Sequence, residues 1–141
     1  MKYIFIILSG LFFFTQVLSD DVTIEMLNKL GKERMIFSEK IVNVNAGDTV
    51  FWKATDKGHN VEFIKNGTPE GVEKFKSKLS EDTKYKFETS GIYAYWCTPH
   101  KALGMIGFII VGNDKLNLDS INKIKFFGKS KKIAKMLIAQ F

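Results

Sequence analysis

The stretch that decides the fold is residues 92–111, IYAYWCTPHKALGMIGFIIV, in which two apolar runs flank a short polar loop. The first run ends at Cys97, and residues 106–111 form an almost unbroken apolar run, as in a strand buried inside a sandwich. The loop between them contains His100 and Met105, and Cys97 is the only cysteine of the chain. The stretch predicts two strands that hold three possible metal donors close together.

The sequence before this stretch also consists of short extended segments. Some alternate apolar and polar residues, others are rich in β-branched and aromatic residues, and turn-forming residues such as 45–48 and 90–91 separate them. We expect strands at 22–26, 35–37, 41–44, 49–53, 59–64 and 83–88, with residues 28–33 as a turn. Residues 71–78 fit either one helical turn or an irregular crossing segment. This pattern predicts an all-β, two-sheet sandwich of seven to eight strands.

The C-terminal residues show a helical period instead. Apolar side chains recur at three- and four-residue spacing, with Asn117 or Asp119 as a possible N-cap, at Leu118, Ile121, Ile124, Ile133, Met136, Leu137 and Phe141. We predict two short amphipathic helices that pack on the sandwich and turn their lysines outward. The alternative is a basic helix that lies on a membrane surface.

The N-terminus has the features of a secretory signal peptide. Lys2 precedes an apolar run at 4–14, and small residues follow before the acidic start at Asp20. We predict cleavage after Ser19, with residues 1–19 as the signal peptide and 20–141 as a single domain. The alternative is an uncleaved anchor, although the apolar run is shorter than the roughly 20 residues that span a bilayer.

A single cysteine in an exported chain needs an explanation, because exported proteins usually pair their cysteines. Cys97 alone would fit a small buried apolar residue. However, His100 follows it by three residues, and the only other histidine, His59, lies beside a glycine. A thiolate, two imidazoles and the Met105 thioether are the donor set of a blue-copper electron-transfer site. The sequence therefore predicts one copper ion that cycles between Cu(I) and Cu(II).

The charge balance bears on partners. The chain has 21 basic and 15 acidic side chains, and removal of residues 1–19 takes away only Lys2, which leaves a net charge of +5. An excess of this kind suggests an acidic partner surface or an anionic membrane, or a surface tuned for solubility. We expect a monomer with no nucleic-acid partner and no stable membrane association after cleavage.

The combined motifs resemble those of the pseudoazurins in the cupredoxin family. The matching segments are Cys97-Thr98-Pro99-His100 with Gly104-Met105, and residues 55–61. The resemblance extends over the whole predicted mature chain and implies a cupredoxin-like Greek-key fold. It implies that His59, Cys97 and His100 bind copper in plane, that Met105 is axial, and that the backbone N–H of Asn60 donates to the Cys97 sulfur. Pro99, which lacks an N–H, is expected to tune the metal by leaving out one donor near the thiolate.

The resemblance also implies a function. Pseudoazurins are periplasmic one-electron carriers that pass electrons chiefly to copper nitrite reductase, and a cytochrome-like protein is the expected donor here. They dock through an apolar patch ringed by lysines, which here would comprise Pro99, Ala102 and Leu103 with Lys29, Lys57, Lys76 and Lys101. Trp96 departs from the pattern, because a charged residue often precedes the cysteine in this family.

Three other functions fit parts of the sequence. A thiol enzyme would use Cys97 and a histidine, but would leave the second histidine and Met105 without a role. A copper chaperone or storage protein would generally use several Met or Cys ligands, and this chain offers one of each. A structural role without metal would leave the clustered donors unexplained. We therefore predict an electron-transfer protein and not an enzyme.

Overall fold

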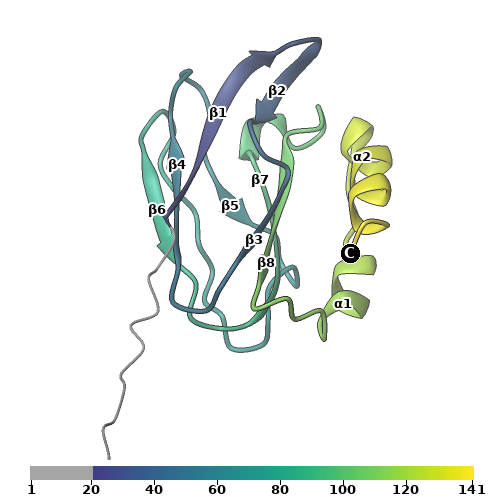
Figure 1. The fold of residues 1–141 in the computed structure, drawn as a ribbon. Coiled ribbons are helices and arrows are strands. Elements are labelled where there is room, and N and C mark those ends of the chain that lie inside the picture. Colours follow the sequence, from purple (N-terminus) through teal and green to yellow (C-terminus); the bar gives the residue numbers. More distant parts are fainter. Residues whose placement is uncertain (1–20) are drawn as a thin grey trace, which may run out of the picture.

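Eight strands form two sheets that pack face to face in a computed structural model, which describes residues 21–141 (Figure 1). One sheet has the order β2-β1-β4-β6, with β1 at Val22–Leu30, β2 at Glu33–Phe37, β4 at Thr49–Lys53 and β6 at Thr83–Lys86. The other has the order β3-β8-β7-β5, with β3 at Ile41–Val44, β8 at Ile106–Val111, β7 at Gly91–Trp96 and β5 at Glu62–Phe63. The predicted all-β sandwich is confirmed.

Both sheets are mixed. Strands β1 and β4 pair in parallel, as do β3 and β8, while the remaining pairs are antiparallel. Strand β8 lies between β3 and β7 and is buried along its whole length. This position explains its unbroken apolar sequence, because both faces of the strand are covered.

Two local predictions were wrong or too broad, and a third had left two alternatives open. Residues 28–30 belong to β1 and not to a turn, because β1 continues into a hairpin with β2 and pairs Leu30 with Glu33. Strand β5 covers only two residues, since the carbonyl groups of His59 and Val61 accept bonds from Ser80 and Ser77 and not from a neighbouring strand. Residues 71–78 form no helix. Their one regular contact is an isolated bridge between Glu62 and Lys76, so they are an irregular crossing segment.

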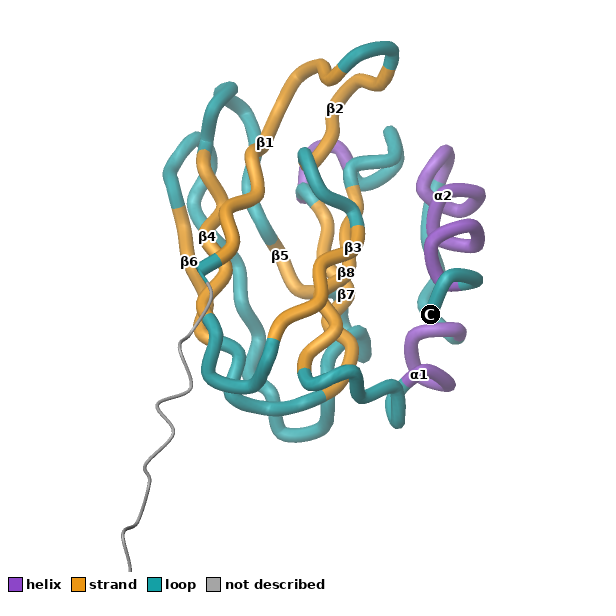
Figure 2. The backbone as a smooth tube through the Cα atoms, viewed as in Figure 1, coloured by secondary structure: helices purple, strands orange, loops and turns teal. Residues whose placement is uncertain are grey.

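Two apolar clusters stabilise the fold. The first fills the space between the sheets and includes Trp52, Phe87 and Tyr93. The second lies between the β3-β8-β7-β5 sheet and the C-terminal helices, and includes Phe108 and Ile121. Full burial of one large apolar side chain contributes about 1.5–3 kcal/mol to the free energy of folding. Both clusters therefore contribute substantially to stability. The helices therefore form a third layer on one face of the sandwich (Figure 2).

Helix α1 spans Leu118–Asn122 and helix α2 spans Gly128–Ile138. Helix α2 buries Ala134 and Leu137 against the sandwich, which confirms that the helices pack on it. Asn117 occupies the N-cap position of α1, but its side chain bonds the backbone of Ile92 instead of capping the helix. Among residues 21–141, no helix is long and apolar enough to cross a membrane. The predicted signal peptide and its anchor alternative, residues 1–19, lie outside the described residues.

Candidate metal centre

The loop between β7 and β8 presents Cys97 and His100 at one end of the sandwich. Cys97 follows directly on β7, and residues Thr98–His100 form a single 3₁₀ turn. The Cys97 N–H donates to the carbonyl of Met105 at 3.0 Å, and the His100 N–H donates to the carbonyl of Cys97 at 3.0 Å. These bonds close the loop on itself, so the two strands fix the positions of its side chains.

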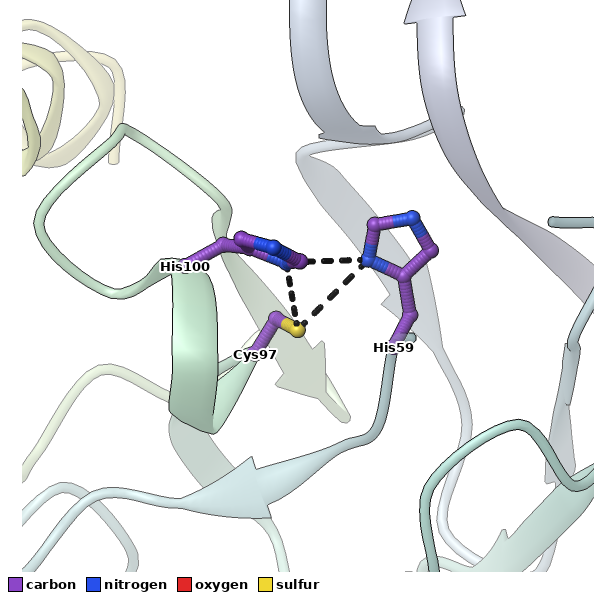
Figure 3. A group of neighbouring side chains, drawn as sticks. All are labelled: His59, Cys97 and His100. Atoms are coloured by element: carbon purple, nitrogen blue, oxygen red, sulfur yellow. Dashed lines mark hydrogen bonds between the residues drawn. The ribbon is translucent and has the colours of Figure 1, made fainter. Parts of the chain in front are cut away.

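His59 comes from a different part of the chain. The sequence predicted a strand at 59–64 that begins with His59, but His59 lies in the irregular segment before β5, where its backbone carbonyl accepts a hydrogen bond from the Ser80 N–H at 2.9 Å. Its side chain is fully buried and points to the β7–β8 loop (Figure 3). Pairing of β5 with β7 in one sheet therefore brings together histidines that are 41 residues apart.

Three donor atoms converge at this point. His59 Nδ1 lies 3.1 Å from His100 Nδ1 and 3.7 Å from Cys97 Sγ, while His100 Nδ1 lies 3.4 Å from the same sulfur (Figure 3). Metal bonds to imidazole and thiolate are about 2.0–2.3 Å long, so three donors in a plane around one ion lie roughly 3.5 Å apart. The triangle of donor atoms therefore fits one metal ion at its centre.

Met105 is buried next to this triangle. Its side chain is fully buried, and its backbone carbonyl accepts the hydrogen bond from the Cys97 N–H. Gly104 before it has a φ of +107°, a conformation that glycine adopts readily. A Cβ at Gly104 would lie 2.6 Å from the Ile133 side chain of α2, so the loop and helix α2 are in close contact.

The protonation tendencies of the site suit a metal. Burial lowers the pKa of His59, and the neighbouring His100 lowers it further, while Asp56 opposes both effects. Burial also lowers the pKa of His100. Both imidazoles therefore favour the neutral form that binds metals. In this structure both imidazoles face the thiol with the same ring nitrogen, Nδ1.

The cysteine is not an activated nucleophile. Burial raises the pKa of the Cys97 thiol, although the backbone N–H groups of Asn60 and His100 act in the opposite direction. The side chain is also inaccessible to solvent. A thiol enzyme needs a reactive, reachable thiolate, so the geometry speaks against that alternative.

A hydrogen-bond network ties the two ligand-bearing segments together. The Thr98 N–H donates to Asn60 Oδ1 at 2.8 Å, and Asn60 Nδ2 donates to Thr98 Oγ1 at 2.9 Å. Glu62 Oε2 then accepts bonds from Thr98 Oγ1 at 2.7 Å and from Trp96 Nε1 at 3.0 Å. We call these four residues the Asn60–Glu62 clamp. It fixes the residues beside His59 relative to those beside Cys97.

The clamp keeps Glu62 ionised. Burial alone would raise the pKa of Glu62, but hydrogen bonds from Thr98 and Trp96, together with Lys76, lower it overall. Sequence reasoning did not identify Glu62 or Thr98 in this role. Glu62 and Trp96 are paired across β5 and β7, and this register cannot be recognised without knowing which strands are neighbours.

Asn28 is another contributor that sequence reasoning missed. Its Oδ1 lies 3.0 Å from His59 Nε2, so it can accept a hydrogen bond from a proton on that nitrogen, and Nδ1 is left to face the sulfur. The Asn28 N–H is itself held by Asp56 Oδ2 at 2.6 Å. Asn28 is a polar residue near the end of β1, and a prediction that β1 continues to Leu30 would have drawn attention to it. Residues 28–33 were instead predicted to be a turn.

The surface beside His100 is partly apolar. Pro99, Ala102 and Leu103 are exposed there, with Leu103 48% exposed, while His100 is half-buried. Helix α2 supports this loop from behind, because the Lys129 N–H donates to the Ala102 carbonyl at 2.9 Å.

The four candidate docking lysines are not equivalent. Lys29 and Lys57 are exposed, whereas Lys76 pairs with Glu62 at 3.4 Å. Lys101 lies over the Trp96 ring, with its Nζ 5.1 Å from the ring centre. Trp96 therefore holds the Lys101 cation over the face of its ring.

Comparison with known proteins identifies relatives of this chain. Residues 24–112 match a family model described as copper binding proteins of the plastocyanin/azurin family. Pseudoazurin of Paracoccus pantotrophus is 39% identical over 117 residues, which cover 83% of this chain and 81% of the relative. Pseudoazurin of Methylorubrum extorquens is 33% identical over 122 residues, which cover 86% and 82%.

The structural comparison agrees. The crystal structure of pseudoazurin from Methylobacterium extorquens AM1 superimposes with a TM-score of 0.82 at 33% identity, and the match covers 86% of this chain and 98% of that one. The match includes the C-terminal helical region in part, since the sandwich alone would cover less of either chain.

Proposed function

Because the chain belongs to the plastocyanin/azurin family of copper-binding proteins and is related to the pseudoazurins in it, we propose that it is a periplasmic electron carrier with a blue-copper site. Members of this family transfer electrons and are not enzymes. The proposed ligands are His59, Cys97 and His100 in plane, with Met105 axial.

The observation that carries the ligand assignment is the triangle of His59 Nδ1, His100 Nδ1 and Cys97 Sγ. Copper, when bound there, supplies a one-electron couple between Cu(II) and Cu(I). The chain contributes rigidity, since the closed β7–β8 loop and the Asn60–Glu62 clamp hold the donors in place. Small rearrangement favours fast electron transfer, because little energy is needed to change the donor positions.

His100 is the proposed electron port. It is half-buried at the exposed apolar patch, whereas His59 is fully buried. A partner that excludes water at Pro99, Ala102 and Leu103 would come close to the His100 ring. We propose a nitrite-reductase-like acceptor and a cytochrome-like donor, each with an acidic surface that Lys29 and Lys57 attract.

The test is electron transfer from the reduced, copper-loaded protein to a copper nitrite reductase, measured by stopped-flow absorbance. Leu103→Ser should raise the concentration of carrier needed for half-maximal rate, because it removes apolar area from the patch. Leu116→Ser is the matched control, since Leu116 is 92% exposed and lies in the segment that leads to α1, away from the ligand loop. Equal effects of both variants would contradict docking at the patch.

The location has its own test. The processed chain should be found in the periplasmic fraction, and its mass should correspond to a start at Asp20. A chain that keeps residues 1–19 and sediments with membranes would contradict the proposed signal peptide.

A further inference from the structure

The positive charge of the chain is concentrated at its C-terminus. Residues 120–141 contain six lysines and no acidic residue, while residues 20–119 contain 14 basic and 15 acidic residues. The net side-chain charge is therefore +6 for residues 120–141 and −1 for residues 20–119. The six lysines are Lys123, Lys125, Lys129, Lys131, Lys132 and Lys135.

These lysines are free to meet a partner. All six are exposed, and the four ion pairs within the described residues 21–141 involve other lysines. The acidic residue nearest in sequence, Asp119, precedes the segment. The charge is therefore not balanced within this part of the fold, and it attracts anions from outside.

Apolar surface accompanies the charge. A groove of about 800 Å³ runs between α1 and α2, with Ile121 and Ala134 among its buried lining residues. Its lining has no acidic residue and includes four of the lysines: Lys123, Lys125, Lys131 and Lys135. Phe127 and Met136, in the same segment, are 51% and 53% exposed.

The segment lies along a side face of the sandwich (Figure 1). At one end, the Asn117 side chain holds the start of α1 to Ile92, at the beginning of β7 and far from Cys97. At the other end, the Lys129 N–H donates a hydrogen bond to the backbone carbonyl of Ala102 in the ligand loop. A flat partner on this face therefore contacts the helical segment along the length of the sandwich. The end of the sandwich around His100 stays open to solvent.

We propose that residues 120–141 form a peripheral membrane-binding surface for anionic phospholipids. Clusters of four to eight lysines on an amphipathic helix are typical of such surfaces, and exposed apolar side chains among them strengthen binding. Lysines spread over a whole face suit a lipid surface, whose charges can rearrange. Helix α2 does not insert its apolar face, because Ala134 and Leu137 are buried against the sandwich. The attachment is therefore electrostatic and reversible by salt, unlike a stable anchor.

Vesicle binding tests this proposal directly. The processed, copper-loaded protein is mixed with vesicles of phosphatidylcholine, with or without 30% phosphatidylglycerol, and the bound fraction is measured by sedimentation. We expect binding to the anionic vesicles at low salt, release at 0.5 M salt and little binding to phosphatidylcholine alone. Equal binding to both kinds of vesicle, or binding to neither, would overturn the proposal.

Matched charge reversals locate the binding face. Lys131→Glu with Lys135→Glu should lower the partition to anionic vesicles by about thirtyfold or more, because two lysines near the surface together contribute about 2 kcal/mol to binding. Lys53→Glu with Lys84→Glu changes the net charge equally on exposed residues of the other sheet, and should have a much smaller effect. Equal losses in both double variants would show that net charge alone governs binding and would overturn the assignment of this face.

The copper site provides an independent check. Both double variants should keep the absorption spectrum of the wild type, since none of the four lysine side chains is a proposed ligand or takes part in the Asn60–Glu62 clamp. If Lys131→Glu with Lys135→Glu slows reaction with a soluble acidic redox partner while the wild type does not bind anionic vesicles, the face docks a protein and the membrane proposal is wrong. A copper-loaded wild type that lacks the blue-copper absorption band would instead contradict the proposed copper site.

Discussion

The most informative perturbation of the clamp is Asn60→Ala. The Asn60 side chain is 1% exposed and makes three hydrogen bonds: with the Thr98 N–H at 2.8 Å, with Thr98 Oγ1 at 2.9 Å and with the Ser77 carbonyl at 3.3 Å. Each such bond contributes about 0.5–1.5 kcal/mol, and a buried donor left without a partner costs about 1–3 kcal/mol. We expect the free energy of unfolding of the copper-free protein to fall by about 2–4 kcal/mol.

The same change should alter the metal site. Without its side chain, residue 60 no longer holds its own N–H in place near the Cys97 sulfur, and a thiolate that loses a donated hydrogen bond favours Cu(II). If the weakened bond differs by about 1 kcal/mol between the two oxidation states, the reduction potential should fall by about 40 mV. Urea unfolding gives the first quantity and voltammetry of the copper-loaded protein gives the second.

Asn117→Ala is the matched control. The Asn117 side chain also makes paired bonds to a backbone, with the Ile92 N–H at 2.9 Å and the Ile92 carbonyl at 2.8 Å, but at the far end of β7. We expect it to cost about 1–3 kcal/mol of stability and to leave the potential unchanged. If both variants shift the potential equally, or if Asn60→Ala shifts it no more than the measurement error, the reasoning about the clamp is refuted.

Three further predictions concern docking, potential and pH. Lys57→Glu should slow association with an acidic redox partner, and less so at high salt, without changing the copper spectrum; rates that respond to neither would reject the docking role. Pro99→Ala, which restores a possible N–H donor near the thiolate, should raise the reduction potential, and voltammetry that finds no rise counts against it. Because burial lowers the pKa of His59 and of His100, the unfolded chain takes up protons at higher pH than the folded one. The copper-free protein should therefore lose stability as the pH falls below about 6.5, by up to about 1.4 kcal/mol per pH unit for each histidine, and a histidine-free variant with the same slope in urea unfolding would contradict this.

The strands and the donor set were predictable from local patterns. Residues 41–44, 49–53 and 106–111 are strands over the predicted bounds, because alternation and β-branched composition report on burial within one segment. The cluster of Cys97 and His100 was also evident, since only two residues lie between them. These features depend only on residues that are close in sequence.

The features that depend on distant residues were harder to predict. His59 was assigned to a strand, yet the loops around Ser77 and Ser80 take up the hydrogen bonds of its segment. Residues 28–30 contain polar side chains and a glycine follows, so they appeared turn-like, although the hairpin with β2 makes them a strand. Tertiary contacts overrode the local preference in both cases.

The Asn60–Glu62 clamp also depends on residues far apart in the sequence, so it could not be predicted from local patterns. Glu62 has no special sequence context, and its role follows from the pairing of β5 with β7. Trp96 was recognised as unusual, but its bond to Glu62 and the cation of Lys101 over its ring became apparent only in three dimensions. Sequence identified the donors, whereas the structure identified what holds them.

The most direct test of the central claim is the visible absorption spectrum of the protein loaded with Cu(II). A short bond from copper to the Cys97 thiolate should give an intense charge-transfer band in the wild type, at one copper ion per chain, and Cys97→Ser should be colourless. A wild type that binds Cu(II) without this band, or a Cys97→Ser variant that keeps it, would contradict the blue-copper site.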